Sequence, residues 1–272
     1  MAITKRSAGP RERNASISPC GDCSSRACAF CAELREEGRA HVQSCVERVH
    51  VSAKQVLVEE GSADADVVTL VDGVVIAFVS LAGGLRQVTG FHFAGDLLHW
   101  PRDSVTSRVT LHALTPASVC RIDRDRLHEL CYSYPELADR LSDLASVQID
   151  AAREHMVVLA RGTAEQRVSS FLMGLTHRTG DRCVIASSID LPMSRVDIAN
   201  YVGLRIETVS RIFTRLTSAG LLSLPTPQQG MVMDHCALAD RANILARATG
   251  AEPRSTNDGG CRAQKLDLRH FP

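Results

Sequence analysis

The chain has 272 residues, with 31 Lys and Arg side chains, 31 Asp and Glu side chains and ten cysteines. This length allows one large domain or two to three small ones. The formal net charge is +0, so charge alone neither indicates nor excludes a polyanionic partner. The sequence has no apolar run of about 18 residues and no signal-peptide pattern, which predicts a cytoplasmic protein without membrane contact.

The N-terminal region concentrates cysteine, with four thiols in the segment CGDCSSRACAFC, residues 20–31. Residues 1–19 ahead of it are polar and are predicted to form a disordered leader. Thiols stay reduced in the cytoplasm, so residues 20–48 indicate metal binding or redox chemistry rather than a disulfide framework. The cysteines interpreted as structural are Cys45, Cys131, Cys183 and Cys236.

Residues 49–132 alternate short β-branched runs with glycines. Asp72-Gly73 lies between two valine-rich runs and predicts a hairpin, and Gly83-Gly84 predicts another. This pattern is typical of a small antiparallel barrel or sandwich. The family resemblance given below implies that this region is the sensor domain.

A helical period starts near Tyr134 and predicts a dimerisation helix over residues 133–161. A 4-3 spacing sustained over three heptads favours pairing of two such helices in a homodimer. The stripe begins with leucine and becomes polar or small, so the predicted dimer is weak and its formation is conditional. The predicted interface residues are Leu137, Leu141, Leu144, Gln148, Ala151 and His155.

Residues 162–236 contain the capping and turn residues typical of a helix-turn-helix. Ser194 and Asp197 form an S-x-x-D capping pattern that starts one helix, and Gly203 provides the residue with positive φ that ends it. A second helix follows, and LSLPTPQQGMVMDH predicts a wing hairpin. Residues 237–272 are predicted to be a C-terminal helix and a disordered tail.

The second helix presents side chains that suit a DNA groove. The spacing of Ile206 and Val209 with later apolar residues predicts one buried face. Glu207, Ser210 and Arg211 fall on the opposite face, where Arg can bond guanine, Glu can accept from cytosine, and Ser can reach base edges or phosphate. Glu207 and Arg211 would alternatively form an i,i+4 ion pair. Their position after a glycine turn and a capped helix favours DNA binding.

Two segments, TGFHFAGDL and YVGLRIETVSR, together with the cysteine-rich leader and the long helix, resemble the CRP/FNR family of bacterial transcription regulators. The resemblance spans about residues 20–240 and is closer to the oxygen-sensing FNR branch. It implies an α+β fold with an N-terminal cyclic-nucleotide-binding-like β-roll, a long dimerisation helix and a C-terminal winged helix-turn-helix. It also implies a homodimer that binds TTGAT-type inverted repeats in double-stranded DNA through Glu207, Ser210 and Arg211, and that acts on RNA polymerase.

The resemblance further implies a 4Fe-4S cluster held by three leader cysteines and one β-roll cysteine, which makes residues 20–48 a cluster-binding segment. Cys20, Cys23 and Cys31 fit a C-x2-C-x7-C spacing of this family, and Cys120 occupies the β-roll position. Cys28 stays open as the alternative to Cys31, because C-x2-C-x4-C approximates the other spacing of the family. In such sensors oxygen degrades the cluster and the two subunits separate.

The residues also bear on four functions other than oxygen sensing through a cluster. Zinc is an alternative ligand for the thiols, and a haem or nitric-oxide sensor would use His92, His99 or His112. No cAMP response is expected, since Asp96 stands where related cAMP binders have glutamate and no Arg-Ser pair follows. No enzyme is expected either: the sequence lacks P-loop, GxSxG and HExxH motifs, and its CxxC lies in a polar leader rather than at a βα junction.

Overall fold

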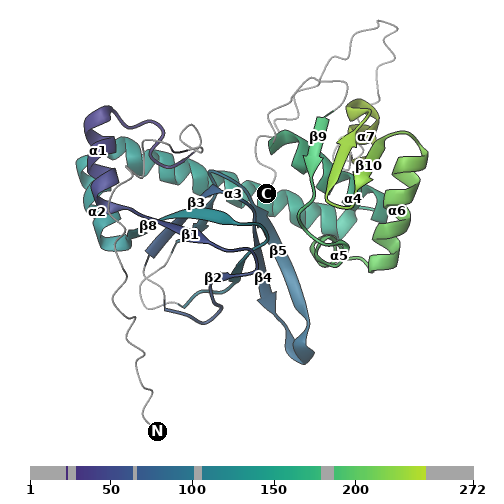
Figure 1. Cartoon of the computed structure of the whole chain (residues 1–272), viewed down its shortest axis with the longest axis horizontal. Helices are drawn as coiled ribbons and strands as arrows, with labels where there is room; N and C mark the ends of the chain where they lie inside the picture. The colour runs from purple at the N-terminus through teal and green to yellow at the C-terminus, as the bar shows by residue number, and fades with distance from the viewer. Residues whose placement is uncertain (1–22, 24–28, 64–65, 101–105, 179–186, 243–272) are drawn as a thin grey trace, which may run out of the picture.

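The computed structural model describes residues 23, 29–63, 66–100, 106–178 and 187–242 (Figure 1). A β-rich N-terminal body and a largely helical C-terminal body are joined by the long helix α3 (Pro135–Arg161). Residues 1–19 of the predicted leader lie outside the described residues, as does the part of the predicted tail after residue 242. A short C-terminal helix, α7 (His235–Ala242), is present.

The N-terminal body is a roll of two four-stranded antiparallel sheets within the described residues. One sheet has the strand order β1-β8-β3-β6, and the other has the order β2-β7-β4-β5. Valine recurs in these strands because β-branched side chains suit a pleated, half-buried surface. The strands are β1 (Glu47–Val51), β2 (Val56–Val58), β3 (Asp66–Asp72), β4 (Val75–Ser80), β5 (Arg86–His92), β6 (Leu97–His99), β7 (Thr110–Ala113) and β8 (Ala117–Asp123).

Strand β3 is buried on both faces, and its successive side chains enter two different clusters. Val68 and Leu70 pack between the two sheets with Val119 of β8. Val67 packs on the other side, with Phe30 of the leader and residues of three helices. Those helices are α1 (Glu36–Cys45), α2 (Arg124–Ser133) and the first half of α3. The leader and these helices therefore form an outer layer on one sheet.

Both predicted glycine turns exist, but they have different roles. At Gly73, where φ is 92°, a Cβ would lie 2.6 Å from the carbonyl oxygen of Pro116, so a larger residue does not fit. The prediction of a hairpin at Asp72-Gly73 is wrong, because β3 and β4 belong to different sheets and this turn links them. The turn around Gly83, which includes the 3-10 segment Ala82–Gly84, does close the β4–β5 hairpin.

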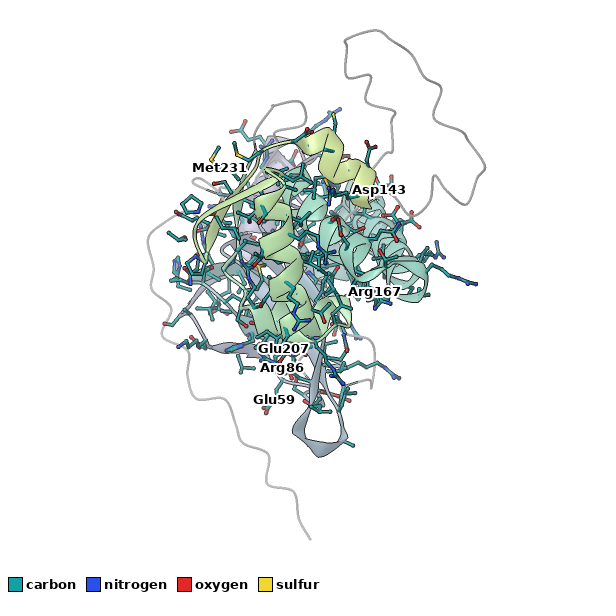
Figure 2. The ribbon with its side chains drawn as sticks, turned by 90° about the vertical axis from the view of Figure 1, so that its right-hand side faces the viewer. Glu59, Arg86, Asp143, Arg167, Glu207 and Met231 are labelled. Atoms are coloured by element: carbon teal, nitrogen blue, oxygen red, sulfur yellow. The ribbon has the colours of Figure 1, made fainter. Side chains whose placement is uncertain are left out.

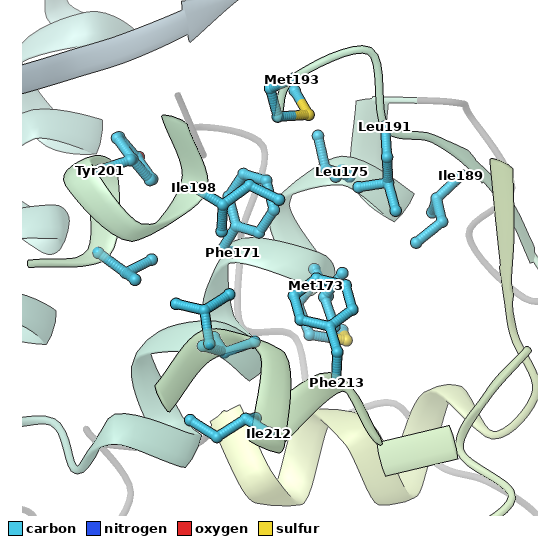
Figure 3. Packing of buried hydrophobic residues seen from close by; sticks show 14 of the residues in the cluster. Phe171, Met173, Leu175, Ile189, Leu191, Met193, Ile198, Tyr201, Ile212 and Phe213 are labelled. Carbon is cyan, nitrogen blue, oxygen red and sulfur yellow. The ribbon is translucent and has the colours of Figure 1, made fainter. Parts of the chain in front are cut away.

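The C-terminal body has the elements of a winged helix-turn-helix around one apolar core (Figure 3). Phe171, Ile198, Tyr201 and Phe213 converge in this core. The core continues into the roll through Phe91 and its neighbours, so the two bodies share buried surface. The elements are α4 (Ala164–Arg178), β9 (Ser187–Asp190), α5 (Arg195–Val202), α6 (Ile206–Ser218), β10 (Leu222–Thr226), β11 (Gln229–Val232) and α7, with sheet order β10-β11-β9.

The local signals predicted for the helix-turn-helix are confirmed. The Ser194 side chain accepts from the Asp197 backbone N–H, and the Asp197 carboxylate accepts from the Ser194 backbone N–H, which forms a complete capping box. Gly203 ends α5 in the left-handed region, with φ of 63°. Among the described helices, none is long and apolar enough to cross a membrane.

Candidate functional sites: a cysteine pocket and a DNA-reading helix

Three of the four cysteines predicted as ligands lie around one small cavity. Cys23 and Cys31 of the leader and Cys120 of β8 line a space of about 20 Å³. The other lining residues are Ala29, Phe30, Val42, Val46, Thr69 and Val71. Cys20 and Cys28 lie outside the described residues, so the identity of the remaining ligand and the choice between Cys28 and Cys31 stay predictions.

Local structure explains how each thiol reaches the cavity. Cys31 lies in a turn ahead of α1, where its carbonyl accepts from the backbone N–H of Leu34 at 3.3 Å, and its side chain is buried. Cys120 pairs with Thr69 of β3 in the sheet. Ile122, two residues after Cys120 in the same strand, packs in the outer layer. Side chains two positions apart in a strand lie on the same face. Cys120 therefore faces the leader rather than the interior of the roll.

The donors of this cavity are thiols, which both an iron-sulfur cluster and a zinc ion use as ligands. Among the described residues, no three His, Cys, Asp or Glu side chains lie close enough to hold one ion. A 4Fe-4S cluster needs less convergence, because each thiolate binds a different iron, whereas zinc needs four ligands at about 2.0–2.3 Å from one atom. An apolar lining around the thiols also suits a cluster, since it limits solvent access.

The size of the cavity limits how a cluster enters. A space of about 20 Å³ admits little more than one water-sized sphere. In this conformation the cavity is therefore smaller than a cubane. Phe30 and Cys31 of the leader share one apolar cluster with Leu137 and Leu141 of α3. The leader and the long helix are thus packed against each other.

The second site is the exposed face of α6 (Figure 2). Glu207, Ser210 and Arg211 are all exposed there. Neither Glu207 nor Arg211 forms a hydrogen bond or ion pair with another described residue, so the alternative of an i,i+4 pair is not realised. The predicted burial of Ile206 is wrong, since this side chain is 39% exposed and Ile212 occupies the buried face instead.

Sequence reasoning missed Arg195, the first residue of α5. Arg195 and Ser210 line a hollow of about 390 Å³ beside α6 that also carries three further hydroxyl side chains. The Arg195 guanidinium lies 3.6 Å from the ring centre of Phe213, and its buried Nη1 has no hydrogen-bond partner among the described residues. Burial lowers the pKa of Arg195. The available signal was its place directly after the cap Ser194, in the first turn of α5.

The hairpin β4–β5 ties the roll to the helix-turn-helix. Arg86 at the start of β5 forms an ion pair with the buried Asp197 of the capping box, and Gln87 Nε2 donates to the backbone oxygen of Asn200. An aromatic stack continues this junction, because the His155 ring of α3 lies 4.1 Å from the Tyr201 ring of α5 at an angle of 11°. The sensor hairpin, the long helix and the first helix of the helix-turn-helix therefore meet at one place.

Part of the predicted dimer stripe of α3 is buried within the single chain. Leu137 is 0% exposed, and Leu141 and Ala151 are also buried within the single chain. Leu144 packs against the outer-layer cluster. Gln148 Nε2 donates to the backbone oxygen of Leu97 at 2.7 Å, and His155 stacks on Tyr201 as described above. Leu137, Leu141 and Ala151 thus hold α3 to its own chain, which heptad spacing cannot distinguish from pairing with a second helix. The other three residues of the stripe are partly exposed, and their place in a dimer interface stays a prediction.

The three histidines considered as ligands of a haem or nitric-oxide sensor lie on strands of the roll. The His112 ring contacts the backbone oxygen of Lys54 at 2.6 Å, and His92 lies 3.7 Å from Asp96, so both rings already have polar neighbours. His99 lies on β6, in a different sheet from the one that contains His92 and His112. Cys236 in α7 is disulfide-bonded, so the expectation of reduced thiols is wrong at this residue.

A β-roll joined by a long helix to a winged helix-turn-helix with an exposed polar face defines a DNA-binding transcription regulator with a sensor domain. Residues 166–241 match the Crp-like helix-turn-helix domain. The chain belongs to the CRP/FNR family of transcription regulators and is not an enzyme. It is 34% identical to the transcriptional activator protein Anr of Pseudomonas aeruginosa over 81% of this chain and 92% of that protein.

Further relatives agree with this membership. The chain is 32% identical to the nitrogen fixation regulation protein FixK of Bradyrhizobium diazoefficiens, over 75% of this chain and 86% of that protein. Its structure resembles FixK2 from Bradyrhizobium japonicum with a TM-score of 0.66 and 27% identity, over 73% of this chain and 98% of that one. A mutant of CooA from Carboxydothermus hydrogenoformans shares the fold, with a TM-score of 0.62 and 16% identity.

Proposed function

We propose that this regulator senses oxygen through a 4Fe-4S cluster bound by Cys20, Cys23, Cys31 and Cys120, and that it activates transcription at low oxygen. The observation that carries this proposal is the meeting of Cys23, Cys31 and Cys120, from two distant parts of the sequence, at one apolar cavity. A similar protein, 30% identical over 75% of this chain, is the anaerobic regulatory protein of Haemophilus influenzae. When bound, the cluster supplies the iron and sulfide that react with oxygen.

The residues around the cavity transmit the state of the site. Phe30 and Cys31 pack in the same apolar cluster as Leu137 and Leu141, so a leader held outward by a bound cluster alters the seating of α3. Because α3 also contacts α5 through His155 and Tyr201, this change reaches the helix-turn-helix. The chain thereby has a continuous packed route from the thiols to the DNA-reading helix.

For DNA recognition we propose that Glu207, Ser210 and Arg211 read base edges of TTGAT-type half-sites. Arg195, which is half-buried, and the hydroxyl side chains beside it provide a phosphate contact, because a guanidinium N–H without a partner among the described residues suits an anionic oxygen. RNA polymerase is the partner expected for an activator of this family.

For the homodimer we propose that the interface also includes exposed apolar residues of α3 beside the stripe predicted by heptad spacing. Ile149 and Met156 are 51% and 60% exposed and lie seven residues apart, which places both on the same face of the helix. Burial of these side chains against a second copy would remove apolar surface from water. Met156→Asp should therefore reduce dimerisation by roughly ten-fold or more, measured by sedimentation of anaerobic protein. Asp143→Ala, at an exposed position roughly a third of a turn around the helix from Ile149, is the control.

The test of the cluster is an anaerobic spectrum with iron and sulfide analysis, repeated after exposure to air. We expect a brown protein with iron and sulfide in equal amounts that bleaches in air, and DNA binding that weakens in parallel. A colourless preparation that contains zinc would show that the thiols bind zinc rather than an iron-sulfur cluster. DNA binding that is unaffected by air would contradict oxygen sensing even if iron is present.

A further inference from the structure

The cysteine pocket contains one hydroxyl side chain whose role the proposed ligands do not explain. Thr69, in the middle of β3, lines the cavity beside Cys120 and is only 2% exposed. Its Oγ1 is buried and has no hydrogen-bond partner among the described residues. The other lining side chains are aliphatic, aromatic or thiol groups.

The register of the sheet fixes where this hydroxyl lies. Thr69 is directly opposite Cys120 in the β3–β8 pair. Directly paired residues place their side chains on the same face, with Cβ atoms about 4.5–5.5 Å apart. Val67, two residues before Thr69, packs in the outer layer, so the Thr69 side chain also faces the leader. The hydroxyl and the Cys120 thiol therefore face the same small volume.

An unpaired hydroxyl is an unfavourable choice for this position. Burying a hydroxyl group without a hydrogen bond is costly, whereas valine has nearly the same shape and no polar atom to satisfy. The neighbours Val68 and Val71 show that this strand accommodates valine. Thr69 therefore points to an acceptor that the described part of the polypeptide does not provide.

We propose that Thr69 is a positioning residue for the cluster: its Oγ1–H donates a hydrogen bond to sulfur in the occupied pocket, the Cys120 thiolate or an adjacent sulfide. This inference rests on the proposed function. Thiolate and sulfide are acceptors with negative charge, and hydrogen bonds to the sulfurs of a cluster help to set its reduction potential. The bond would hold Cys120 in place and slow the loss of the cluster in oxygen.

The proposal predicts opposite effects of one substitution in the empty and the loaded protein. In the metal-free protein, Thr69→Val removes an unsatisfied polar group, so the melting temperature rises by about 2–4 °C. In the anaerobically loaded protein, the same substitution removes a hydrogen bond, so the cluster absorbance decays in air roughly three- to ten-fold faster and the reduction potential falls. Thr69→Ser keeps the donor and should retain the wild-type decay rate and potential.

Two further sets of variants serve as controls for the Thr69→Val measurement. Ser169 of α4 also has a buried Oγ without a partner among the described residues, far from the pocket in the C-terminal body. Ser169→Ala should raise the metal-free melting temperature but leave the decay rate unchanged. If Thr69→Val disturbs folding, Thr69→Ala and Thr69→Ser are compared instead, since the alanine variant loses the donor and the serine variant keeps it.

The outcomes separate the inference from the proposed function. Wild-type protein that binds a cluster, together with a Thr69→Val variant whose decay rate and potential match wild type, would overturn the role of Thr69 and leave the cluster in place. A Thr69→Ser variant that behaves like Thr69→Val would overturn it as well, because the donor alone would then not matter. Anaerobic wild-type protein without iron would overturn both proposals.

Discussion

The helix-turn-helix and the cysteine pocket reach their functional geometry by different routes. In the helix-turn-helix, Glu207, Ser210 and Arg211 lie within five consecutive residues, and the helix that carries them is complete in the single chain. In the pocket, Cys23, Thr69 and Cys120 are far apart in the sequence and meet only through strand pairing and the seating of the leader. The face proposed to read DNA is complete within one helix, whereas the pocket holds side chains whose proposed partner is a bound ligand.

This difference predicts different responses to substitution. A change in the pocket removes one of a small set of ligands, so its effect on the cluster approaches all or none. A change on α6 removes one contact among many to DNA, so its effect is graded. The junction between the two regions, at Arg86 and His155, should show the smallest effects.

The largest effect is expected for Cys120→Ser. A serine hydroxyl does not replace the thiolate, so the iron content of anaerobic protein should fall close to zero. Cys131→Ser is the matched control, because Cys131 lies on α2 outside the pocket and burial raises the pKa of its thiol, which keeps it protonated. Iron and sulfide analysis measures the result, and a Cys120→Ser protein with full iron content would show that the pocket is not the binding site.

A graded effect is expected for Arg211→Ala. Loss of a bidentate base contact should weaken binding to the half-site by about 1–3 kcal/mol and relax preference at one base pair. Competition with sites altered at each position measures it. Arg215→Ala is the control on the same helix, since its guanidinium donates to Glu165 at 3.0 Å. An equal loss on every sequence would make Arg211 a phosphate contact.

A smaller effect is expected for Arg86→Ala at the junction. Asp197 would lose a partner of its buried carboxylate but would keep the capping box, and Arg86 is partly exposed, so the expected cost is about 1 kcal/mol. Hydrogen exchange of the α5 amides should increase accordingly. Arg153→Ala, at an exposed ion pair with Asp150, should leave this exchange unchanged.

The smallest effect is a pH dependence from His155. Burial lowers its pKa from the ordinary value of 6.5; a backbone hydrogen bond with Tyr201 opposes this, and the charge of Arg167 adds to it. The unfolded chain therefore takes up a proton near pH 6.5, while the folded chain does so only at lower pH. The free energy of unfolding should be largest above pH 6.5 and decrease as the pH falls below it.

Urea unfolding at pH 7.5 and 5.5 measures this dependence. His155→Gln should unfold with a smaller difference between the two pH values than wild type, because it lacks the titrating ring. His235, whose pKa is also lowered by burial, contributes in the same direction and remains in the variant. Equal pH dependence in the two proteins would show that His155 is not the responsible group.

Local sequence determined the helix-turn-helix of this protein. Ser194, Asp197 and Gly203 act on backbone groups within a few residues, so capping and turn chemistry alone locate α5 and the start of α6. The alternation of exposed and buried side chains then identifies the DNA-reading face. The error at Ile206 lies in the first turn of α6, where a helix residue has fewer neighbours to cover it.

Tertiary structure decided the rest. Heptad spacing on α3 showed that one face is buried, but only the packing of Leu137 and Leu141 against the leader and the roll showed what covers it. The turn at Gly73 was recognisable, yet strand pairing decided that it links two sheets. Thr69 was an ordinary strand residue in the sequence, and it became a pocket residue because the register places it opposite Cys120. Contacts between distant segments depend on register and layer order, which residues a few positions apart do not encode.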